Sequence, residues 1–395
     1  MNLPLDPDAL RVAQQGEAML ERIQALVPLL RDNSQRAREE RRVPEENVKA
    51  LRTAGFFLAL QPERWGGYAL NPQDFFRMQM TIAEACMSTA WAGGIVAVHA
   101  FQIALMDERA QKDVWGDDIH TLVSSSYAPM GKVEPVEGGF RFSGRWGWSS
   151  GCDHCSWALL GGILPDGGYR TFLVPRSDYR IEDTWHSMGL QGTGSNDIVI
   201  DDAFVPDYRT HGQIDGLKGT NPGVDASSAP IYHLPWAQLF VRVVSTPAIG
   251  AARDALALYT ELVRSKASGD MTKLAQDVST QVRIAEARNS IEEMSAVLFS
   301  SFDSMLAHVN AGGAVPLDDR VLYRYQASLV IEKCMAVVDS LFSSAGGSSV
   351  FTGSVIQQRF LDIHTARAHV ANNPTSFARN LGAVTLGADN GDFFV

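Results

Sequence analysis

The spacing of apolar residues changes twice along this chain, and this change constrains the fold more than any other feature of the sequence. Apolar residues recur at helical spacing over residues 6–118, alternate with small or polar residues over 121–208, and return to helical spacing from about 235 onward. A period near 3.6 predicts helices, and a period of two predicts strands. The chain is therefore expected to fold as helices, then a small β domain, then helices again.

From this order we predict an α+β protein, mostly α, in four segments. They are an N-terminal α-helical domain at residues 1–120, a central antiparallel β-barrel at 121–208, a loop at 209–234, and a helical bundle at 235–395. In the last segment, apolar residues from Ile284 to Leu298 recur three and four apart, which predicts a seam packed on another helix. Long antiparallel helices of this kind form a four-helix bundle, and the faces of such bundles often associate between subunits.

Local signals predict several element ends. Pro44 and the two glutamates after it indicate the start of a helix, which Gly55 ends. Gly138-Gly139 predicts a hairpin turn between two strands. The segment from Phe75 to Met106 is too apolar on all sides for a surface helix, so it predicts two buried helices with a break near Gly93-Gly94.

Composition excludes several classes of protein. Lys and Arg number 34 against 45 Asp and Glu, a net charge of −11, whereas a nucleic-acid binder needs a basic surface. We therefore expect no nucleic-acid partner. The sequence shows no run of about 18 apolar residues and no signal peptide, so we expect a cytoplasmic protein that does not bind membranes. Its four scattered cysteines are too few for a disulfide framework.

Two short motifs invite a metal or nucleotide interpretation and do not support it. Cys152-Asp153-His154-Cys155 is half of a zinc site, but the sequence offers no second half, so we expect no metal. Gly192-Thr193-Gly194-Ser195 lacks the third glycine of a dinucleotide fingerprint and precedes a predicted strand. This turn could still offer backbone N–H groups to a phosphate or to the edge of a flavin ring.

Two histidines in apolar helical surroundings, His99 and His369, each allow two interpretations. Each is either a core residue held by hydrogen bonds or a proton-handling group in a buried pocket, where a near-neutral pKa is useful. The serines at 124–126 and 149–150 are typical of strand ends, and Gly346-Gly347 is typical of a helix C-cap.

Several motifs together resemble the acyl-CoA dehydrogenase fold. Trp148–Gly151 leaves a predicted strand, and Met188–Ser195 followed by Asp201–Pro206 is similar to the barrel signature of that superfamily. Ala345–Gly347 with Gln358–Asp362 is similar to its C-terminal signature, which in relatives borders the flavin of a neighbouring subunit. The resemblance covers nearly the whole chain and implies helices, a β-barrel and a bundle that builds a homotetramer.

One departure from that superfamily concerns its catalytic base. Dehydrogenases of this fold carry a Glu, and nitroalkane oxidases an Asp, shortly after the stretch that ends here at Asp362. No Asp or Glu occurs between Ile363 and Ala388, and the matching position is about Val370. Without a carboxylate the α-proton of an acyl thioester has no obvious acceptor, so dehydrogenation is disfavoured.

A narrower branch of the superfamily matches better. Arg42–Asn47, Ser124–Pro129, Trp146–His154 and Pro175–Tyr179 resemble the oxygenase components of two-component flavin-dependent aromatic monooxygenases, nearest to the 3-hydroxy-9,10-secoandrostatrienedione and 4-hydroxyphenylacetate hydroxylases. The resemblance implies reduced FMN or FAD, supplied by a separate NAD(P)H–flavin reductase and reacting with O2. The resulting C4a-hydroperoxyflavin would hydroxylate a small aromatic substrate.

The same resemblance assigns roles to individual residues. Ser150 would bond near flavin N5 and stabilise the hydroperoxide. His99 and Ser125 would hold and deprotonate a phenol, and His369 would lie beside both the hydroperoxide and the substrate. The remaining expected contacts are Trp91, Trp148, Ser149, Gly192, Thr193, Gly194, Ser195, Gly346 and Gly347 for the flavin, and Tyr232 and Trp236 for the substrate.

A missing charge indicates the class of substrate. In the hydroxyphenylacetate branch the loop before the bundle supplies an Arg for the substrate carboxylate, whereas Ser227–Val241 contains no Lys or Arg here. We therefore expect residues 209–234 to face an uncharged, mostly apolar aromatic of the phenol or indole type. The alternatives are an acyl-CoA dehydrogenase-like dehydrogenase or oxidase, an epoxidase or heteroatom monooxygenase of the same fold, and a helical assembly without catalytic activity.

Overall fold

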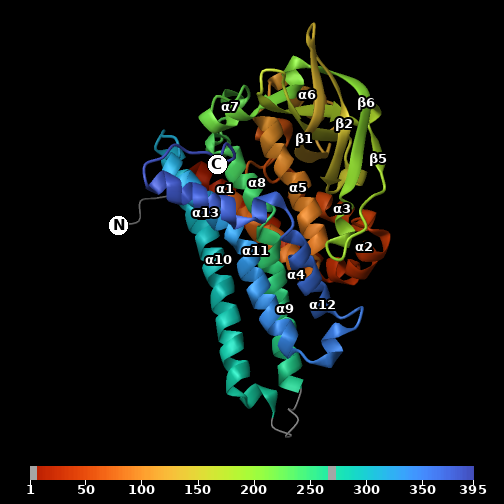
Figure 1. Cartoon of the computed structure of the whole chain (residues 1–395), viewed down its shortest axis with the longest axis vertical. Coiled ribbons are helices and arrows are strands. Elements are labelled where there is room, and N and C mark those ends of the chain that lie inside the picture. The colour runs from red at the N-terminus through yellow and green to blue at the C-terminus, as the bar shows by residue number, and fades with distance from the viewer. Residues whose placement is uncertain (1–6, 266–272) are drawn as a thin grey trace.

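A computed structural model describes residues 7–265 and 273–395, and its elements follow the predicted order of helices, strands and helices (Figure 1). The N-terminal helices are α1 (Pro7–Asp32), α2 (Ser34–Glu40), α3 (Glu45–Ala54), α4 (Pro72–Ala85), α5 (Met87–Ala104) and α6 (Glu108–Trp115). As predicted, α3 begins after Pro44 and ends at Gly55, which has a left-handed backbone (φ 90°).

Helix α5 is the centre of the N-terminal part, and all of its residues are buried. The predicted break at Gly93-Gly94 is wrong, because the two helices separate at Cys86, where the backbone is extended (φ −152°). Gly94 is needed inside α5, since a Cβ there would lie 2.0 Å from the Nε2 atom of Gln79. That nitrogen donates to the carbonyls of Ala90 and Val243, so it ties α4 and α5 to the start of the bundle.

The strands form one seven-stranded sheet in the order β5-β6-β2-β1-β3-β4-β7. Their bounds are β1 (Val123–Val136), β2 (Gly139–Ser149), β3 (Trp157–Ile163), β4 (Tyr169–Pro175), β5 (Arg180–Glu182), β6 (Asn196–Pro206) and β7 (Thr210–Gly212).

One pair of strands corrects the expectation of a purely antiparallel barrel, because β1 and β3 are parallel while the other neighbours are antiparallel. Strand β1 shifts register between Ser126 and Gly131, so its first part pairs with β3 and its last part with β2. The chain reverses at the hairpin after Val136 and again at the turn Cys152–His154. These two reversals make β3 run in the direction of β1.

The segment 209–234, predicted as a loop, also needs a correction. It contains β7, the short helix α7 (Gln213–Lys218) and two 3₁₀ turns. Helix α7 forms because a run of six residues without Pro lies between Gly212 and Gly219, and Gly219 takes the left-handed conformation that ends a helix (φ 71°).

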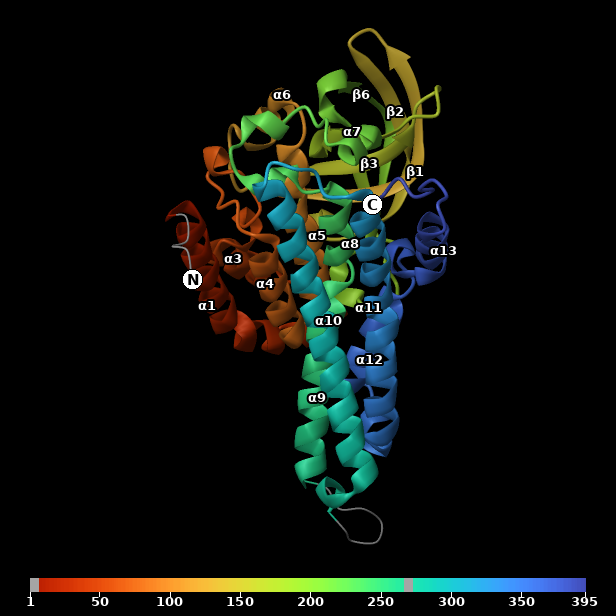
Figure 2. The same ribbon diagram turned by 90° about the vertical axis from the view of Figure 1, so that its left-hand side faces the viewer.

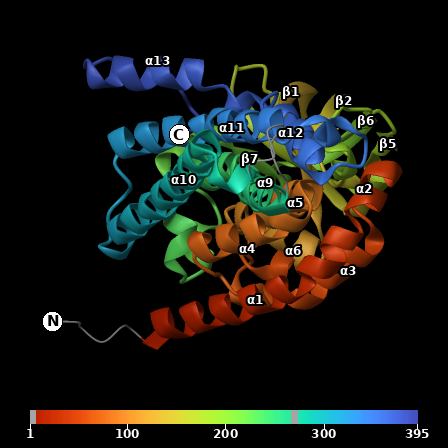
Figure 3. The ribbon, with the colours of Figure 1, turned by 90° about the horizontal axis from the view of Figure 1, so that it is seen from below.

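Long helices of the C-terminal part lie side by side and extend away from the sheet (Figures 2 and 3). The loop between α10 and α11 contains Gly312 and Gly313. The helices of this part are α8 (Trp236–Val243), α9 (Thr246–Ser265), α10 (Val278–Asn310), α11 (Leu317–Ser344), α12 (Val355–Ala366) and α13 (Pro374–Thr385).

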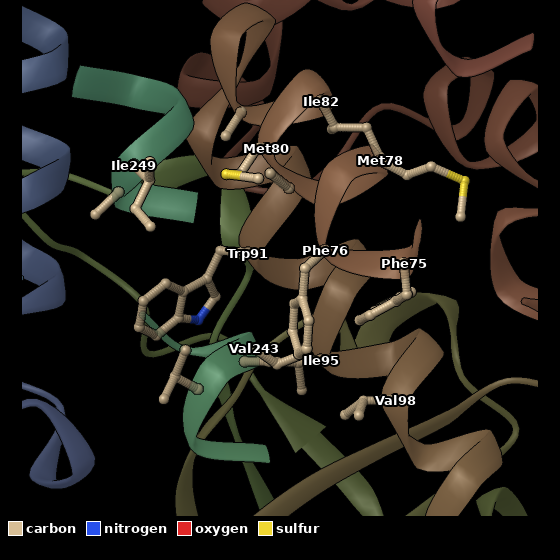
Figure 4. Close-up of a cluster of buried hydrophobic side chains, with 14 of the residues drawn as sticks. Phe75, Phe76, Met78, Met80, Ile82, Trp91, Ile95, Val98, Val243 and Ile249 are labelled. Carbon is tan, nitrogen blue, oxygen red and sulfur yellow. The ribbon is translucent and has the colours of Figure 1, made fainter. Parts of the chain in front are cut away.

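One apolar core runs from the N-terminal helices into the bundle, and a second fills the sheet. Figure 4 shows part of the first, where Phe75 and Phe76 on α4 lie near Trp91 on α5 and Val243 on α8. Phe76 also contacts Phe302 on α10, with 5.2 Å between ring centroids.

Among the residues that the structure describes, no helix is both long and apolar enough to cross a membrane. The division into four segments stays a prediction.

Candidate active site

Two of the predicted site residues come from the buried helix α5. Trp91 and His99 are eight residues apart, about 12 Å along the helix axis. Trp91 bonds to Ser150, which directly follows β2, and His99 lies within bonding distance of Tyr127 on β1. Helix α5 therefore presents two chemically different groups to the sheet.

Ser150 belongs to a chain of buried hydroxyl groups. Trp91 Nε1 donates to Ser150 Oγ at 3.2 Å, and Ser150 Oγ lies 2.8 Å from Ser195 Oγ. Ser195 Oγ lies 2.7 Å from Thr193 Oγ1, which donates its only proton to the Leu190 carbonyl at 2.9 Å. Because each hydroxyl has one proton, Ser195 must donate to Thr193, and Ser150 must donate to Ser195. Towards any further group, Ser150 can therefore only accept a hydrogen bond.

Trp148 and Ser149 precede Ser150 at the end of β2. Trp148 has a positive φ of 63°, which is strained for a bulky residue, and its side chain is 70% exposed. The Ser149 hydroxyl is buried and has no hydrogen-bond partner in the described part of the chain. An exposed ring on a strained backbone beside an unpaired hydroxyl indicates a surface that receives a ligand.

The two ring nitrogens of His99 have different surroundings. Nδ1 lies 3.2 Å from the Tyr127 hydroxyl, whereas Nε2 is buried and has no partner among the described residues. The rings of Trp236 and Phe240 lie 6.2 and 6.4 Å from the His99 ring, centroid to centroid. Burial lowers the pKa of His99 to about 3, so the imidazole is neutral at pH 7. An unpaired nitrogen among aromatic rings suits the polar group of an aromatic ligand.

His369 is held by its other nitrogen. Its Nδ1 accepts from the backbone N–H of Ala371 at 3.2 Å, at the start of the 3₁₀ turn Val370–Asn372. Burial, and then the charge of Arg324, lower the pKa of His369 to about 4. The neutral ring therefore carries its proton on Nε2. The His369 ring lies 5.8 Å from Trp91, so it is close to the hydroxyl chain.

Phe240 on α8 joins the two histidines, and the sequence analysis missed it. Its ring centroid is 6.4 Å from both His99 and His369, and 4.8 Å from Tyr127. Trp236 lies one turn earlier on α8 and faces the same way. An aromatic pair four residues apart at the start of the bundle was the signal that could have found this wall.

The other predicted substrate residues are placed differently. Ser125 lies two residues before Tyr127 on β1, and burial raises the pKa of Tyr127 while the Ser125 side chain opposes that rise. Tyr232 lies farther back, because its hydroxyl donates to the Leu60 carbonyl at 3.0 Å and its ring packs on Phe101. Within the described chain, no bond or ring contact joins Tyr232 to His99.

The glycines of the 192–195 turn have structural reasons to be glycine. A Cβ on Gly192 would lie 2.9 Å from the Cβ of Ala37 on α2, and Gly194 has a left-handed backbone (φ 55°). The Thr193 and Ser195 hydroxyls point into the chain behind Ser150. Their side chains therefore support Ser150 rather than reach a ligand themselves.

The C-terminal signature holds this turn from behind. Asp362 on α12 accepts the N–H of Leu190 at 2.6 Å, which fixes the point where the hydroxyl chain ends. Burial raises the pKa of Asp362, and bonds from Leu190 and Gln358 oppose that rise. In the part of the chain that the structure describes, no hydrogen bond or ring contact links Gly346-Gly347 to Ser150 or His99.

The Cys152–Cys155 run forms a turn with two buried free thiols. They bond to the carbonyls of Gly194 and Gly151, while His154 Nδ1 lies 3.3 Å from Glu45. Across residues 7–265 and 273–395, no cluster of three His, Cys, Asp or Glu side chains could hold a metal ion.

Models of the acyl-CoA dehydrogenase N-terminal domain and C-terminal domain match residues 21–121 and 242–374. Over most of its length the chain is 40% identical to the flavin-dependent monooxygenase oxygenase subunit HsaA of Rhodococcus jostii, covering 90% of this chain and 94% of the relative. It is 32% identical to the p-hydroxyphenylacetate 3-hydroxylase oxygenase component of Acinetobacter baumannii, covering 95% and 90%.

A solved structure agrees with these relatives. The chain matches the crystal structure of the 3-HSA hydroxylase from Rhodococcus sp. RHA1 with a TM-score of 0.92 and 38% identity, covering 96% of this chain and 99% of that one.

Proposed function

Because this chain belongs to the oxygenase subunits of flavin-dependent monooxygenases with the acyl-CoA dehydrogenase fold, we propose that it hydroxylates an uncharged, mostly apolar aromatic compound of the phenol or indole type. It would use O2 and reduced FMN or FAD supplied by a separate NAD(P)H–flavin reductase. The observation that carries the proposal is the unpaired, buried Nε2 atom of His99 among aromatic rings.

The residues around Ser150 fit a reduced flavin. When bound, reduced flavin and O2 supply the electrophilic oxygen, as a C4a-hydroperoxyflavin. Ser150 offers a lone pair, because its proton is committed to Ser195, and a lone pair suits the N–H that reduced flavin carries at N5. Trp148 offers an exposed ring face, and Trp91 would form a second wall and holds Ser150. We assign these residues, with Ser149 and the backbone of 192–195, to flavin binding.

The residues around His99 fit a phenol. His99 would accept the phenol proton, Ser125 would hold the same oxygen, and His369 would present its Nε2 proton from the flavin side. Phe240 and Trp236 supply apolar walls, and Tyr232 supports them from behind through Phe101. A deprotonated phenol is the more nucleophilic ring, so this arrangement favours attack on an electrophilic oxygen.

The uncharged substrate is supported by the position of a buried arginine. Arg242 follows the segment without Lys or Arg, and its side chain is buried. It lies four residues after Gln238, whose side chain donates to the carbonyl of Arg320 on α11. Residues four apart share a helix face, so Arg242 shares the face of α8 that contacts α11, where the charge of Arg324 adds to burial in lowering its pKa. Its Nη2 atom is buried without a partner among the described residues, and within these residues no hydrogen bond or ring contact joins Arg242 to His99 or Phe240. We therefore assign Arg242 no contact with the substrate.

We also propose that the chain forms a homotetramer in which Gly346 and Gly347 approach the flavin of a neighbouring subunit. Exposed apolar side chains support this, since Val350 and Phe351 stand out beyond α11 near these glycines. Light scattering combined with size exclusion would measure the mass, and a monomer at working concentration would contradict the proposal.

The test of the function is anaerobic stopped-flow mixing of the protein with reduced FMN or FAD, then with O2. We expect a long-lived oxygenated flavin that decays faster when a phenol or indole is present. Direct conversion to oxidised flavin and peroxide, unchanged by every aromatic compound tried, would favour the oxidase alternative. Reduction of the bound flavin by an acyl thioester would favour the dehydrogenase.

One substitution tests the role of Ser150. Ser150→Ala removes the hydroxyl acceptor that we assign to the flavin, and we expect the oxygenated flavin to decay about tenfold faster, since one such bond is worth about 1–2 kcal/mol. Ser301→Ala is the matched control, because this buried serine donates to the Val297 carbonyl within α10. Equal lifetimes in both variants would refute the assignment.

A further inference from the structure

A second chain of hydrogen bonds runs behind His99, away from the hydroxyl chain of Ser150. Asn221 Oδ1 lies 2.8 Å from His211 Nε2, and His211 Nδ1 lies 3.3 Å from Gln102 Nε2. The Tyr127 hydroxyl bonds to Gln102 Oε1 and lies 3.2 Å from His99 Nδ1. Apart from the partly exposed Tyr127, these side chains are buried. The chain therefore links the 209–234 segment to the candidate substrate site.

The direction of this chain follows from what each atom can do. The Asn221 oxygen can only accept, so His211 carries its proton on Nε2 and accepts at Nδ1 from Gln102. Gln102 is oriented by a second bond, since its Nε2 donates at 3.2 Å to Thr171 Oγ1. The proton of Thr171 goes to the His211 carbonyl at 3.4 Å, so Thr171 can only accept from Gln102.

The hydrogen bond from Tyr127 to Gln102 also fixes which ring nitrogen of His99 carries the proton. Gln102 Oε1 can only accept, so the single hydroxyl proton of Tyr127 is committed to it. The Tyr127 oxygen is then an acceptor for His99, and His99 must carry its proton on Nδ1. A neutral imidazole has one proton, so Nε2, the nitrogen without a protein partner, is left bare.

We propose that Tyr127 and Gln102 are positioning residues that fix the tautomer of His99 and leave Nε2 as the acceptor for the substrate proton. This inference rests on the proposed function of His99. In the step, the O–H bond of the phenol breaks and an N–H bond forms at Nε2. The imidazolium keeps its Nδ1–H bond to Tyr127, and the electron pair stays on the phenolate oxygen. The opposite tautomer would present an N–H to the phenol and could accept nothing.

The tautomer can be measured without flavin or substrate by ¹⁵N NMR of histidine-labelled protein, in which a protonated and a bare ring nitrogen have separate shifts. The His99 signals are those lost in His99→Asn. We expect a proton on Nδ1 in the unmodified protein. Gln102→Met frees the Tyr127 proton to bond to Nδ1, so we expect the proton of His99 to move to Nε2. A proton on Nε2 in the unmodified protein, or no change in Gln102→Met, would overturn the inference.

The consequence for substrate is measured with 4-nitrophenol, whose ionised form absorbs visible light. We expect the bound probe to be more ionised than in solution, and Tyr127→Phe to reduce the bound ionisation constant about tenfold, one pKa unit. Tyr169→Phe is the matched control, because this partly exposed tyrosine donates to the backbone carbonyl of Tyr127 and not to its side chain. Circular dichroism checks that both variants fold.

The measurements distinguish failure of the proposed role of His99 from failure of the positioning role of Tyr127. If the unmodified protein does not ionise the probe although its His99 proton is on Nδ1, the proposed role of His99 fails and the tautomer assignment stands. If the unmodified protein and Tyr127→Phe ionise the probe equally, the positioning role of Tyr127 is overturned while the role of His99 stands.

Discussion

At the scale of single residues, each of the two candidate-site histidines uses one ring nitrogen to bond to the protein, and the other nitrogen has no hydrogen bond to the described residues. His99 is held through Nδ1 by Tyr127, and His369 through Nδ1 by the N–H of Ala371. The first arrangement leaves a bare nitrogen and the second leaves an N–H. Because their neighbours differ, His99 can accept a proton and His369 can donate one, although the two side chains are identical.

Burial of neutral histidines makes stability depend on pH. The pKa values of His99 and His369 are lowered to about 3 and about 4, and burial also lowers those of His154 and His211. The unfolded chain then binds more protons than the folded chain below pH 6.5, the ordinary value for His. We expect the free energy of unfolding to fall on acidification from about pH 6.5 to 5, by up to about 1.4 kcal/mol per pH unit for each histidine.

Urea unfolding at several pH values measures this slope, and His99→Asn should make it shallower. Below about pH 5 the buried carboxyl groups of Asp74, Glu84 and Asp362, whose pKa values are raised mainly by burial, act in the opposite direction. A slope between pH 6.5 and 5 that is unchanged by His99→Asn would contradict the assignment.

The sequence identified both histidines as candidates because each lies in apolar surroundings, but it left their roles open. Their tautomers depend on partners from other parts of the chain. Tyr127 reaches His99 from β1, Gln102 on α5 bonds to Tyr127, and Thr171 orients Gln102 from β4. No spacing along one element reveals such a chain.

At the scale of elements, helix α12 anchors the turn that supports Ser150. Arg359, buried on α12, pairs with Asp254 on α9 at 2.8 Å and donates to the carbonyls of Glu84 and Ala85 at the end of α4. One turn later, Asp362 holds Leu190. Arg359 and Asp362 of the C-terminal signature therefore hold other elements in place, a role that the signature alone does not indicate.

Removing Arg359 should be costly. Arg359→Ala leaves Asp254 buried with only Arg31, whose side chain is partly exposed, so we expect a loss of about 2 kcal/mol in the free energy of unfolding. Arg367→Ala, at the C-cap of the same helix, breaks an exposed pair with Glu332 and should cost less than about 0.5 kcal/mol. Chemical denaturation measures the free energy of unfolding of both variants. Equal losses would show that the buried Arg359–Asp254 pair contributes no more than the exposed pair.

Element ends were predictable where the signal is local, and not where it is long-range. Pro44 and Gly55 bound α3, and the glycines at 312–313 separate α10 from α11, because caps and turns depend on neighbouring residues. The break at Cys86 was missed because Gly94 is required by packing on Gln79, not by a turn. The parallel pairing of β1 with β3 was missed because β1 pairs with β2 through its last part and with β3 through its first part, which no local pattern reveals.

At the scale of the whole molecule, α5 takes part in two apolar clusters. Ile103 packs in a third cluster with Leu159 on β3 and Leu173 on β4, while other residues of the same helix belong to the helical core. The next residues on these strands, Leu160 and Phe172, belong to the core that fills the sheet. The period change in the sequence predicted the order of the parts. It could not predict that one fully buried helix joins them, since a helix without a polar face gives no direction of packing.

This shared helix predicts that sheet and bundle unfold together. Phe142 lies inside the sheet core, 4.3 Å from Phe172 and 4.9 Å from Trp146 between ring centroids. Phe142→Ala should cost about 3–4 kcal/mol and should speed hydrogen exchange in the bundle as well as in the sheet. Phe204→Ala, at an exposed site on β6, is the control and should change neither. A bundle that stays protected while the sheet exchanges would contradict a single cooperative unit.

The hydroxyl chain behind Ser150 is also a barrier to proton conduction. It starts at the indole N–H of Trp91, which does not give up its proton in water, and it ends at the Leu190 carbonyl, which does not take one up. The chain behind His99 likewise ends at the amide of Asn221. Neither line can carry a proton to the exterior, so under the proposed function a proton accepted by His99 would stay at Nε2 until water reaches it. The two hydrogen-bond chains thus offer no path for proton transfer between the candidate site and the protein behind it.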